Sequence, residues 1–190
     1  MTLPSNTYLG IMSGTSLDGL DLALCQFEEL NHNINFKLIA SETIKYSSDW
    51  KEKLNHVFDA TAVEYFKLNS LYGKFIAEHV NSFLEKNNTT ANFIASHGHT
   101  VFHQPQRKFT LQIGDGRAIK LTTKKPVIYD FRSQDVLMGG NGAPLVPIGD
   151  HFLFSDYDAC LNLGGISNIS YLSNGRRIAF DISICNIALN

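Results

Sequence analysis

The sequence predicts an α/β fold in which a β-meander precedes alternating strands and helices. Tyr8–Met12 and Leu20–Phe27 are apolar runs separated by the polar segment Ser13–Gly19, which is the order strand, turn, strand. Phe36–Tyr46 alternates apolar and polar residues, as a half-buried third strand does. From Val63 to Lys86 apolar residues recur every three or four positions, which predicts a long amphipathic helix.

Shorter elements follow this helix. We expect strands at Phe93–Ser96, Phe109–Ile113 and Pro126–Asp130, with a helix at Gly116–Thr123 before the last of them. The glycine-rich segment Gly139–Pro144 predicts a loop, and Pro144 is placed to start a helix toward Phe154. The remaining expected elements are three strands, a hairpin turn and a terminal helix: Ala159–Leu163, Ser167–Leu172, Ser173–Gly175, Arg177–Asp181 and Ser183–Asn190.

The terminal helix is expected to be unfinished. No capping glycine, basic last turn or proline follows Leu189. The pattern predicts a truncated or split protein, and a frayed natural C-terminus is the alternative.

The composition limits the classes of function. The 190 residues are 44% hydrophobic and 18% charged with a net charge of −2, as in a globular domain. The charge argues against a nucleic-acid-binding surface, and no apolar run is long enough to span a bilayer. Residues 1–6 do not resemble a secretory signal, so we expect a cytoplasmic protein. Cys25, Cys160 and Cys185 predict neither disulfides nor a cysteine zinc site, and we expect them to be small buried hydrophobic residues.

The segment Ser13–Asp21 is the most informative candidate site. Gly14 and Gly19 allow the backbone to turn sharply and to approach a ligand closely. Thr15 and Ser16 offer hydroxyl and N–H groups, which are suited to binding an anion. The segment therefore predicts a phosphate-binding turn, with an ordinary hairpin turn as the alternative.

Two carboxylates in the same segment suggest a metal ion. Asp18 and Asp21 offer the oxygen ligands that magnesium prefers. A Walker P-loop is excluded because Leu20 and Asp21 stand where Lys and Ser or Thr are required, and because a strand follows in place of a helix.

A second glycine turn lies between two later strands. Gly164 and Gly165 interrupt the segment Leu163–Asn168 and repeat the order strand, glycine turn, strand. A nucleotide phosphate held between two hairpin turns explains both segments together, although each alone is also consistent with a simple turn.

Three histidines form a cluster at His97, His99 and His103. The metallohydrolase pattern requires Asp-His where Val101 and Phe102 stand, so we interpret the histidines as hydrogen-bonding groups in a ligand cleft or as residues that stabilise the loop. A zinc site is the alternative.

Charged residues also follow two predicted strands. Asp130 and Arg132 come after the strand that begins at Pro126, where α/β sheets place ligand-binding residues; a surface ion pair is the alternative. Asp181 ends an apolar strand, where partial burial would raise its pKa toward that of a general base. Its alternative role is the N-cap of the following helix.

The segment Gly10–Asp21 resembles the anhydro-N-acetylmuramic acid kinase family. The similarity continues in family order over nearly the whole chain, in the segments Ser96–Thr100, Gln112–Gly114, Asp130–Arg132, Gly142–Pro147, Asn162–Gly165 and Phe180–Asp181. The sequence departs from the family where His99 and Asn141 replace common glutamines, and where Ile182–Cys185 replaces the usual Gly-Pro-Gly.

The resemblance implies an actin/hexokinase-like (ribonuclease H-like) ATPase fold of two lobes. Because the family is about twice this length, we expect residues 1–190 to be the N-terminal lobe, without the adenosine-binding second lobe. It also implies ATP-dependent opening of 1,6-anhydro-N-acetylmuramic acid by water with phosphorylation of the freed 6-hydroxyl. The product is N-acetylmuramic acid 6-phosphate, and the step belongs to peptidoglycan recycling.

The resemblance also implies roles for particular residues. The phosphate-binding residues are Gly14, Thr15, Ser16, Leu17, Asp18, Gly19, Leu20, Asp21, Gly164 and Gly165. Asp18 and Asp21 lie near Mg²⁺, and Asp181 is the base that takes a proton from the attacking water. The sugar-facing candidates are His97, Thr100, Asp130, Arg132 and Asn141. Arg132 also suits the lactyl carboxylate of the sugar.

Two other functions remain as alternatives. The chain is expected to be nearly inactive alone, and a non-catalytic sugar-binding or regulatory module derived from the kinase is the second hypothesis. A metal-dependent hydrolase that uses the three histidines is the third. The expected partner is the small anhydro amino sugar, with no nucleic acid or membrane. We also expect a second copy of the chain or the missing lobe to cover the exposed face.

Overall fold

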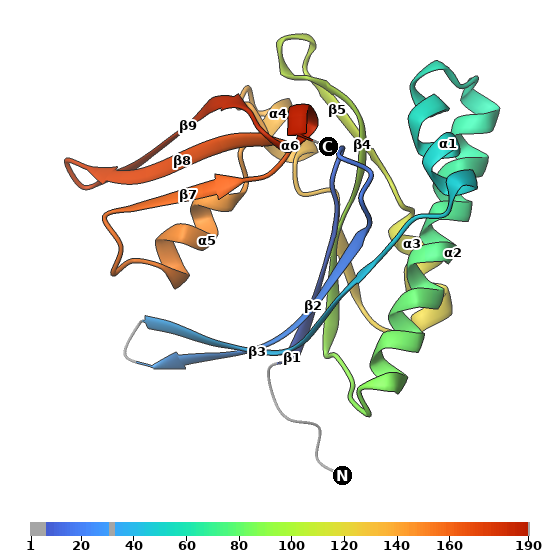
Figure 1. Cartoon of the computed structure of the whole chain (residues 1–190), viewed down its shortest axis with the longest axis horizontal. Helices are drawn as coiled ribbons and strands as arrows, with labels where there is room; N and C mark the ends of the chain where they lie inside the picture. The colour runs from blue at the N-terminus through green and yellow to red at the C-terminus, as the bar shows by residue number, and fades with distance from the viewer. Residues whose placement is uncertain (1–6, 31–32, 190) are drawn as a thin grey trace.

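The computed structural model describes residues 7–30 and 33–189, and within them two β-sheets and a set of helices (Figure 1). The larger sheet contains β1 (Thr7–Ser13), β2 (Leu20–Leu30), β3 (Asn33–Ile44), β4 (Phe93–Gln104), β5 (Phe109–Ile113) and β6 (Val127–Tyr129). The smaller sheet contains β7 (Ala159–Leu163), β8 (Ile166–Ser173) and β9 (Arg176–Ile184). The helices are α1 (Ser48–His56), α2 (Ala62–Lys86), α3 (Gly116–Thr123), α4 (Ser133–Leu137), α5 (Val146–Leu153) and α6 (Asn186–Leu189), with short 3₁₀ turns η1 (Val57–Asp59) and η2 (Pro105–Arg107).

The larger sheet confirms the predicted meander followed by alternation. Strands β1, β2 and β3 pair antiparallel in chain order, and the sheet runs β3-β2-β1-β4-β5, with β6 paired to β4. Strand β4 is parallel to both β1 and β6, and these two strands end beside residues 96–99 of β4, from where β4 continues and pairs with β5. Ligand-binding loops of α/β sheets follow the ends of such parallel strands.

The hydrophobic core lies between the larger sheet and α2. Leu9, Leu22 and Ile94 point from the sheet toward this helix, and Ile76 and Val80 of α2 meet them; each is at most 1% exposed. Figure 1 shows α2 and α3 together on this side of the sheet. The helix begins at a capping box, in which the Thr61 hydroxyl accepts from the Glu64 N–H and the Glu64 carboxylate accepts from the Thr61 N–H.

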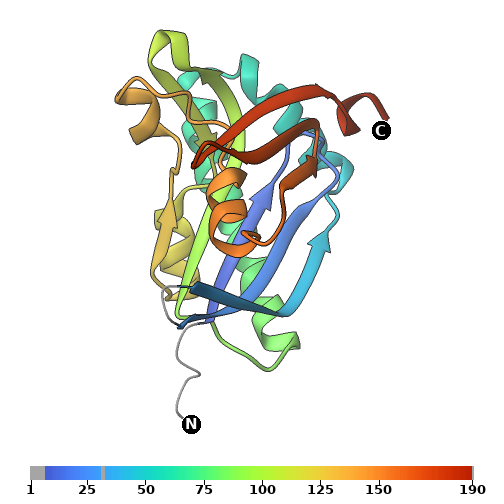
Figure 2. The ribbon, with the colours of Figure 1, turned by 90° about the vertical axis from the view of Figure 1, so that its left-hand side faces the viewer.

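The smaller sheet and α5 lie on the opposite side of the larger sheet (Figures 1 and 2). Phe36 of β3 meets Phe154, which follows α5, in an edge-to-face contact with ring centroids 5.7 Å apart. Much of the apolar surface of the smaller sheet is exposed, at Leu161, Leu163, Ile178, Phe180, Ile182 and Ile184. That a second copy or the missing lobe covers this face stays a prediction.

Several predicted boundaries are wrong. Helices α1 and α4 have no counterpart in the prediction, and α5 begins at Val146 instead of Pro144. Strand β4 continues beyond Ser96 because residues 99–104 pair with β5. The final helix begins at Asn186, because the residues after Asp181 extend β9 against β8, so Asp181 is not its N-cap. The prediction that residues 1–6 are not a secretory signal falls on residues outside the described part of the chain. The same holds for residue 190, the last residue of the predicted terminal helix.

The cysteines are free thiols, and Cys25, Cys160 and Cys185 are each half-buried, so the prediction of full burial is wrong. Burial raises the pKa of the Cys25 thiol. A search of the helices in residues 7–30 and 33–189 finds none with the length and apolar character needed to cross a membrane.

Candidate functional site

The turn after β1 and the loop after β6 lie on either side of the middle of β4. Ile11 of β1 lies opposite Ser96 of β4, and Ser96 lies opposite Tyr129 of β6. The turn after β1, the segment around His97 and the loop that begins at Asp130 are therefore neighbours. The structure thus brings together the first predicted phosphate turn and part of the predicted sugar-binding set.

The turn between β1 and β2 is tightly packed. Its main chain is closed by a hydrogen bond from the Leu17 N–H to the Gly14 carbonyl at 3.4 Å, with Leu17 at φ +56°. A Cβ atom at Gly19 would lie 2.7 Å from the carbonyl oxygen of Ile44, so this position requires glycine. The N–H groups of Thr15 and Ser16 donate to no other described residue, which leaves them for an anion.

The two aspartates of this turn are exposed and separately hydrogen-bonded. The Ser16 hydroxyl donates to Asp18 Oδ1 at 2.9 Å, and the Thr43 hydroxyl donates to Asp21 Oδ1. Within the described chain, no group of three or more His, Cys, Asp or Glu side chains is arranged as a metal site. Magnesium commonly takes only one or two carboxylates together with phosphate oxygens, so this pair suits an ion that arrives with a nucleotide.

A buried ring of hydroxyl groups lies directly below the turn. Tyr72 of α2 donates to Ser13 Oγ at 2.8 Å, Ser13 Oγ lies 2.9 Å from the Tyr46 hydroxyl, and the two tyrosine oxygens are 2.6 Å apart. All three side chains are at most 5% exposed. Because Ser13 directly precedes Gly14, the ring ties the start of the turn to α2 and to the residues after β3.

His99 contacts the same ring. Its Nδ1 lies 3.4 Å from Ser13 Oγ, and burial lowers its pKa to about 4, with a smaller effect of His97. The side chain is therefore neutral at pH 7. The family that the sequence resembles commonly has glutamine at this position, which is also a neutral hydrogen-bonding side chain.

The pKa of His99 predicts the pH dependence of stability. In the unfolded chain its pKa returns to about 6.5, so the unfolded state binds more protons between pH 6.5 and 4. We expect the free energy of unfolding to fall by about 3 kcal/mol as the pH falls through this window. The measurement is urea unfolding at a series of pH values. The free energy of unfolding of His99→Gln should depend less on pH between 6.5 and 4 than that of the unsubstituted chain. An identical curve for this variant would contradict the assignment.

His97 and Arg132 form a second hydrogen-bonded unit. His97 Nδ1–H donates to the Gly98 carbonyl at 2.8 Å, so its Nε2 is free to accept from Arg132 Nε at 2.9 Å. Arg132 also donates to the carbonyl oxygen of Gly142. Burial lowers the pKa of His97, and the Arg132 charge acts in the same direction. The alternative interpretation was a surface ion pair between Asp130 and Arg132. The ion pairs between described residues do not include it.

The three histidines do not meet as metal ligands. His103 is exposed, and its Nδ1 lies 3.1 Å from the Thr110 hydroxyl, while His97 and His99 bond to Gly98 and Ser13. Each ring is thus part of a separate hydrogen-bonded group within the described chain. This geometry favours the interpretation of the histidines as hydrogen-bonding residues.

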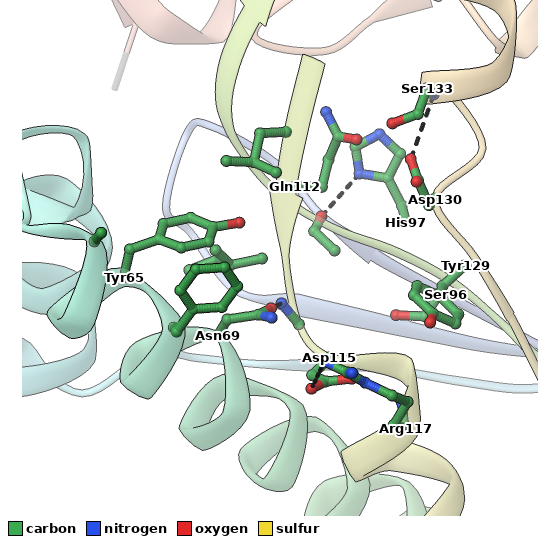
Figure 3. A pocket seen from close by; sticks show the side chains of 16 residues that line it. Tyr65, Asn69, Ser96, His97, Gln112, Asp115, Arg117, Tyr129, Asp130 and Ser133 are labelled. Atoms are coloured by element: carbon green, nitrogen blue, oxygen red, sulfur yellow. Dashed lines mark hydrogen bonds and ion pairs between the residues drawn. The ribbon is translucent and has the colours of Figure 1, made fainter. Parts of the chain in front are cut away.

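A cavity of about 380 Å³ opens beside His97 (Figure 3). Its walls come from the start of α2, residues 96–98 of β4, the end of β5, the start of α3 and the loop after β6. The lining side chains with polar atoms are Tyr65, Asn69, Ser96, His97, Gln112, Asp115, Arg117, Tyr129, Asp130 and Ser133. Asn69 Oδ1 accepts from the Gly114 N–H at 2.8 Å, which holds the end of β5 against α2.

The other sugar-facing candidates are less closely grouped. Asp130 lies on the cavity wall in the left-handed region at φ +59°, and its Oδ1 accepts from the Ser133 N–H at 3.3 Å. Thr100 is half-buried and opposite Gln112, outside the cavity lining. Asn141 is exposed in the loop before α5. Of the sugar-facing candidates, His97 and Asp130 therefore line the cavity. Arg132 is outside the lining and is hydrogen-bonded to His97.

The second glycine turn and Asp181 lie on the smaller sheet. The carbonyls of Gly164 and Gly165 accept from the N–H groups of Asn186 and Cys185 at 3.1 and 2.9 Å. Asp181 is exposed in β9 opposite Asn168. No hydrogen bond or ion pair between described residues links these groups to residues 14–21.

Comparison with known proteins decides the family. The family model described as anhydro-N-acetylmuramic acid kinase matches residues 6–190. The chain belongs to this family. Family members have the actin/hexokinase-like ATPase fold, which agrees with the sheet order of β1–β6 and with the fold predicted from the sequence.

The chain resembles proteins named anhydro-N-acetylmuramic acid kinase from several bacteria. It is 38% identical to the one from Pseudoalteromonas translucida over 98% of this chain and 52% of the relative. For the proteins from Pseudoalteromonas atlantica and Haemophilus influenzae the identity is 40%, over 88% and 96% of this chain and 46% and 50% of those relatives. The chain spans about half the length of the curated relatives it matches.

Two residues of the cavity beside His97 were not predicted from the sequence. Tyr65 and Asn69 are contributed by α2, where the apolar periodicity accounts for the neighbouring residues as core. A signal was present, because Asn69 is a polar residue between Leu68 and Leu71 on a largely apolar stripe. Gln112 was part of the family resemblance but had no assigned role.

Proposed function

We propose that this chain provides the phosphate-binding and sugar-facing part of an anhydro-N-acetylmuramic acid kinase. The observation that carries the proposal is the family match over residues 6–190. The proposed reaction is the ATP-dependent hydrolysis of 1,6-anhydro-N-acetylmuramic acid with phosphorylation of its 6-hydroxyl, in peptidoglycan recycling. Its location in the cytoplasm stays a prediction.

The turn Gly14–Asp21 is proposed to bind nucleotide phosphate. The free N–H groups of Thr15 and Ser16 suit phosphate oxygens, and Asp18 and Asp21 suit the magnesium ion that accompanies them. Magnesium would neutralise charge on the transferred phosphoryl group. Gly164 and Gly165 are proposed as the second phosphate turn, although their carbonyls are bonded to the start of α6.

The proposed general base is Asp181. Water must lose a proton as it attacks the anomeric carbon, while the bond to the 6-oxygen breaks and that oxygen takes up the phosphoryl group. A carboxylate can accept this proton. The exposed side chain of Asp181 is free of any hydrogen bond in the described chain, so it is accessible to a water molecule.

The sugar is proposed to lie at the edge formed by β4 and β6. His97 and Asp130 line the cavity there, and Arg132 is hydrogen-bonded to His97. Thr100 of β4 and Asn141 of the loop before α5 are the remaining sugar-facing candidates, outside the cavity lining. Arg132 is half-buried and carries a positive charge, which suits the lactyl carboxylate.

The proposal predicts that the 190-residue chain alone has little or no kinase turnover, because half the length of its relatives is absent. Adding the remaining half of a relative as a second polypeptide, or fusing it to this chain, should restore phosphorylation of the anhydro sugar. The assay follows ADP release and the 6-phosphate product. Full activity of the chain alone would contradict the two-part proposal.

A second candidate is a non-catalytic sugar-binding or regulatory module derived from the kinase, because the sugar-facing residues His97 and Asp130 line a cavity within this chain. This hypothesis predicts sugar binding by the chain alone, independent of nucleotide, and no gain of turnover on addition of the other half. Calorimetry with the anhydro sugar and with ATP separates the two hypotheses.

A further inference from the structure

The ring of buried hydroxyl groups below the turn Gly14–Asp21 is closed and dry. Ser13, Tyr46 and Tyr72 each contact the other two, with oxygen–oxygen distances of 2.9, 2.6 and 2.8 Å. Trp50 packs against Tyr72 and Phe75 packs against Tyr46, with ring centroids 5.5 and 6.1 Å apart. Because both tyrosines are at most 5% exposed, water has little access to replace a lost bond.

The backbone at Ser13 depends on these side-chain bonds. Strand β1 pairs with β4 in one register up to Ile11, and a shift in register then places Ser13 opposite His99. The turn that follows is closed by the long hydrogen bond of 3.4 Å from the Leu17 N–H to the Gly14 carbonyl. A ring that holds the Ser13 side chain therefore fixes where the turn begins, and with it the free N–H groups of the turn.

The protons of the ring determine the tautomer of His99. Burial raises the pKa of both tyrosine hydroxyls, so each keeps its proton at pH 7. The three hydroxyls then have three protons for three contacts, and a closed ring uses all of them in whichever direction it runs. None is left for His99 Nδ1, 3.4 Å from Ser13 Oγ, so this nitrogen must carry a proton and donate it. Glutamine, which the family commonly has at this position, also offers N–H donors.

We propose that Tyr46 and Tyr72 are positioning residues for nucleotide binding, which act through the Ser13 hydroxyl, and that their ring holds His99 as the Nδ1–H tautomer. The inference rests on the proposed function, because it takes Gly14–Asp21 as the phosphate turn. It adds that a core residue of α2 and a residue just after β3 set the geometry of that turn.

The variant Tyr72→Phe removes one hydroxyl from the ring and keeps the aromatic packing. We expect ATP to bind the 190-residue chain about fivefold more weakly in calorimetric titration with magnesium present, the equivalent of one hydrogen bond. The melting temperature should fall by about 2–4 °C.

The matched control is Thr123→Val. The buried Thr123 hydroxyl donates to the Ile119 carbonyl at 2.8 Å within α3, so its removal also costs one buried hydrogen bond. This variant should lose about as much in melting temperature and bind ATP as tightly as the unsubstituted chain. The comparison separates an effect on the turn from a general loss of stability.

A double-mutant cycle with Ser13→Ala tests whether Tyr72 acts through Ser13. Where the Ser13 hydroxyl is absent, Tyr72→Phe should weaken ATP binding by less than about twofold, because the bond that transmits its effect is already lost. An effect of the same size with and without the Ser13 hydroxyl would overturn the inference.

The tautomer of His99 gives a readout that needs no nucleotide. Protonated and unprotonated ring nitrogens give separate signals in ¹H–¹⁵N NMR spectra of histidine side chains. We expect Nδ1 of His99 to carry the proton in the free chain at pH 7. An unprotonated Nδ1 would contradict the closed ring and overturn the inference.

Titration of the unsubstituted chain with ATP keeps failure of the inference distinct from failure of the proposed function. If this chain binds ATP and Tyr72→Phe binds it as tightly as Thr123→Val does, the positioning role is rejected and the phosphate turn stands. If the unsubstituted chain binds no ATP, the phosphate turn and the inference are rejected together.

Discussion

Replacing Asp181 by asparagine is expected to lower kcat by at least 100-fold in the kinase restored with the second half of a relative. Asparagine has nearly the same size but cannot accept the proton of the attacking water. Loss of a general base typically costs about 10²–10⁴ in rate. The KM values for ATP and sugar should change little, because the side chain is proposed to act on water.

The control for this prediction is Asp158→Asn. Asp158 is another exposed aspartate, located just before β7, and has no role in the proposed reaction. It should retain normal turnover. Activity of Asp181→Asn comparable to the control would remove Asp181 from the mechanism and leave the family assignment intact.

The surroundings of Asp181 show a limit of sequence analysis. Where the family usually has Gly-Pro-Gly, this chain has Ile182–Cys185, and β9 continues to Ile184 against the start of β8, with a register shift between Asp181 and Ser183. β-Branched residues favour an extended strand, whereas glycine and proline interrupt one. The predicted strand ended at Asp181 because residues 183–190 were assigned to a terminal helix.

Most of the fold could be predicted because its periodic signals are long. The twenty-five residues of α2 repeat an apolar stripe over many turns, and the alternation in β1 matches its burial. Helix α1 was missed because it is largely polar and only Leu54 is fully buried. Its start is capped locally, by a hydrogen bond from the Trp50 N–H to the Ser47 hydroxyl at 3.2 Å.

The site could be predicted only where topology alone brings residues together. The parallel pairing of β1, β4 and β6 accounts for the meeting of the Ser13–Asp21 turn, His97 and Asp130. The partners of buried polar groups were not predictable. Tyr72 fits the apolar stripe of α2, and nothing in its spacing indicates that its hydroxyl reaches Ser13, 59 positions away.

The packing of Gly19 makes the phosphate turn sensitive to a single methyl group. A Cβ at this position would lie 2.7 Å from both the Ile44 carbonyl oxygen and the Thr43 Cγ2. The neighbouring residues Leu20 and Ile44 are directly paired between β2 and β3, so the backbone has little room to move. The strain must be relieved by separating the turn from β3.

Gly19→Ala is therefore expected to lower the free energy of unfolding by about 3 kcal/mol and to weaken ATP binding by at least tenfold, since overpacking forces backbone shifts of this cost. Urea unfolding and calorimetric titration with ATP measure the two effects. Gly10→Ala is the matched control on β1, because a Cβ there would lie an ordinary 3.8 Å from the Ala23 carbonyl oxygen. If Gly19→Ala binds ATP as tightly as Gly10→Ala does, the turn does not contact the nucleotide. Loss of ATP binding with the fold intact would instead support the assignment of this turn as the phosphate site.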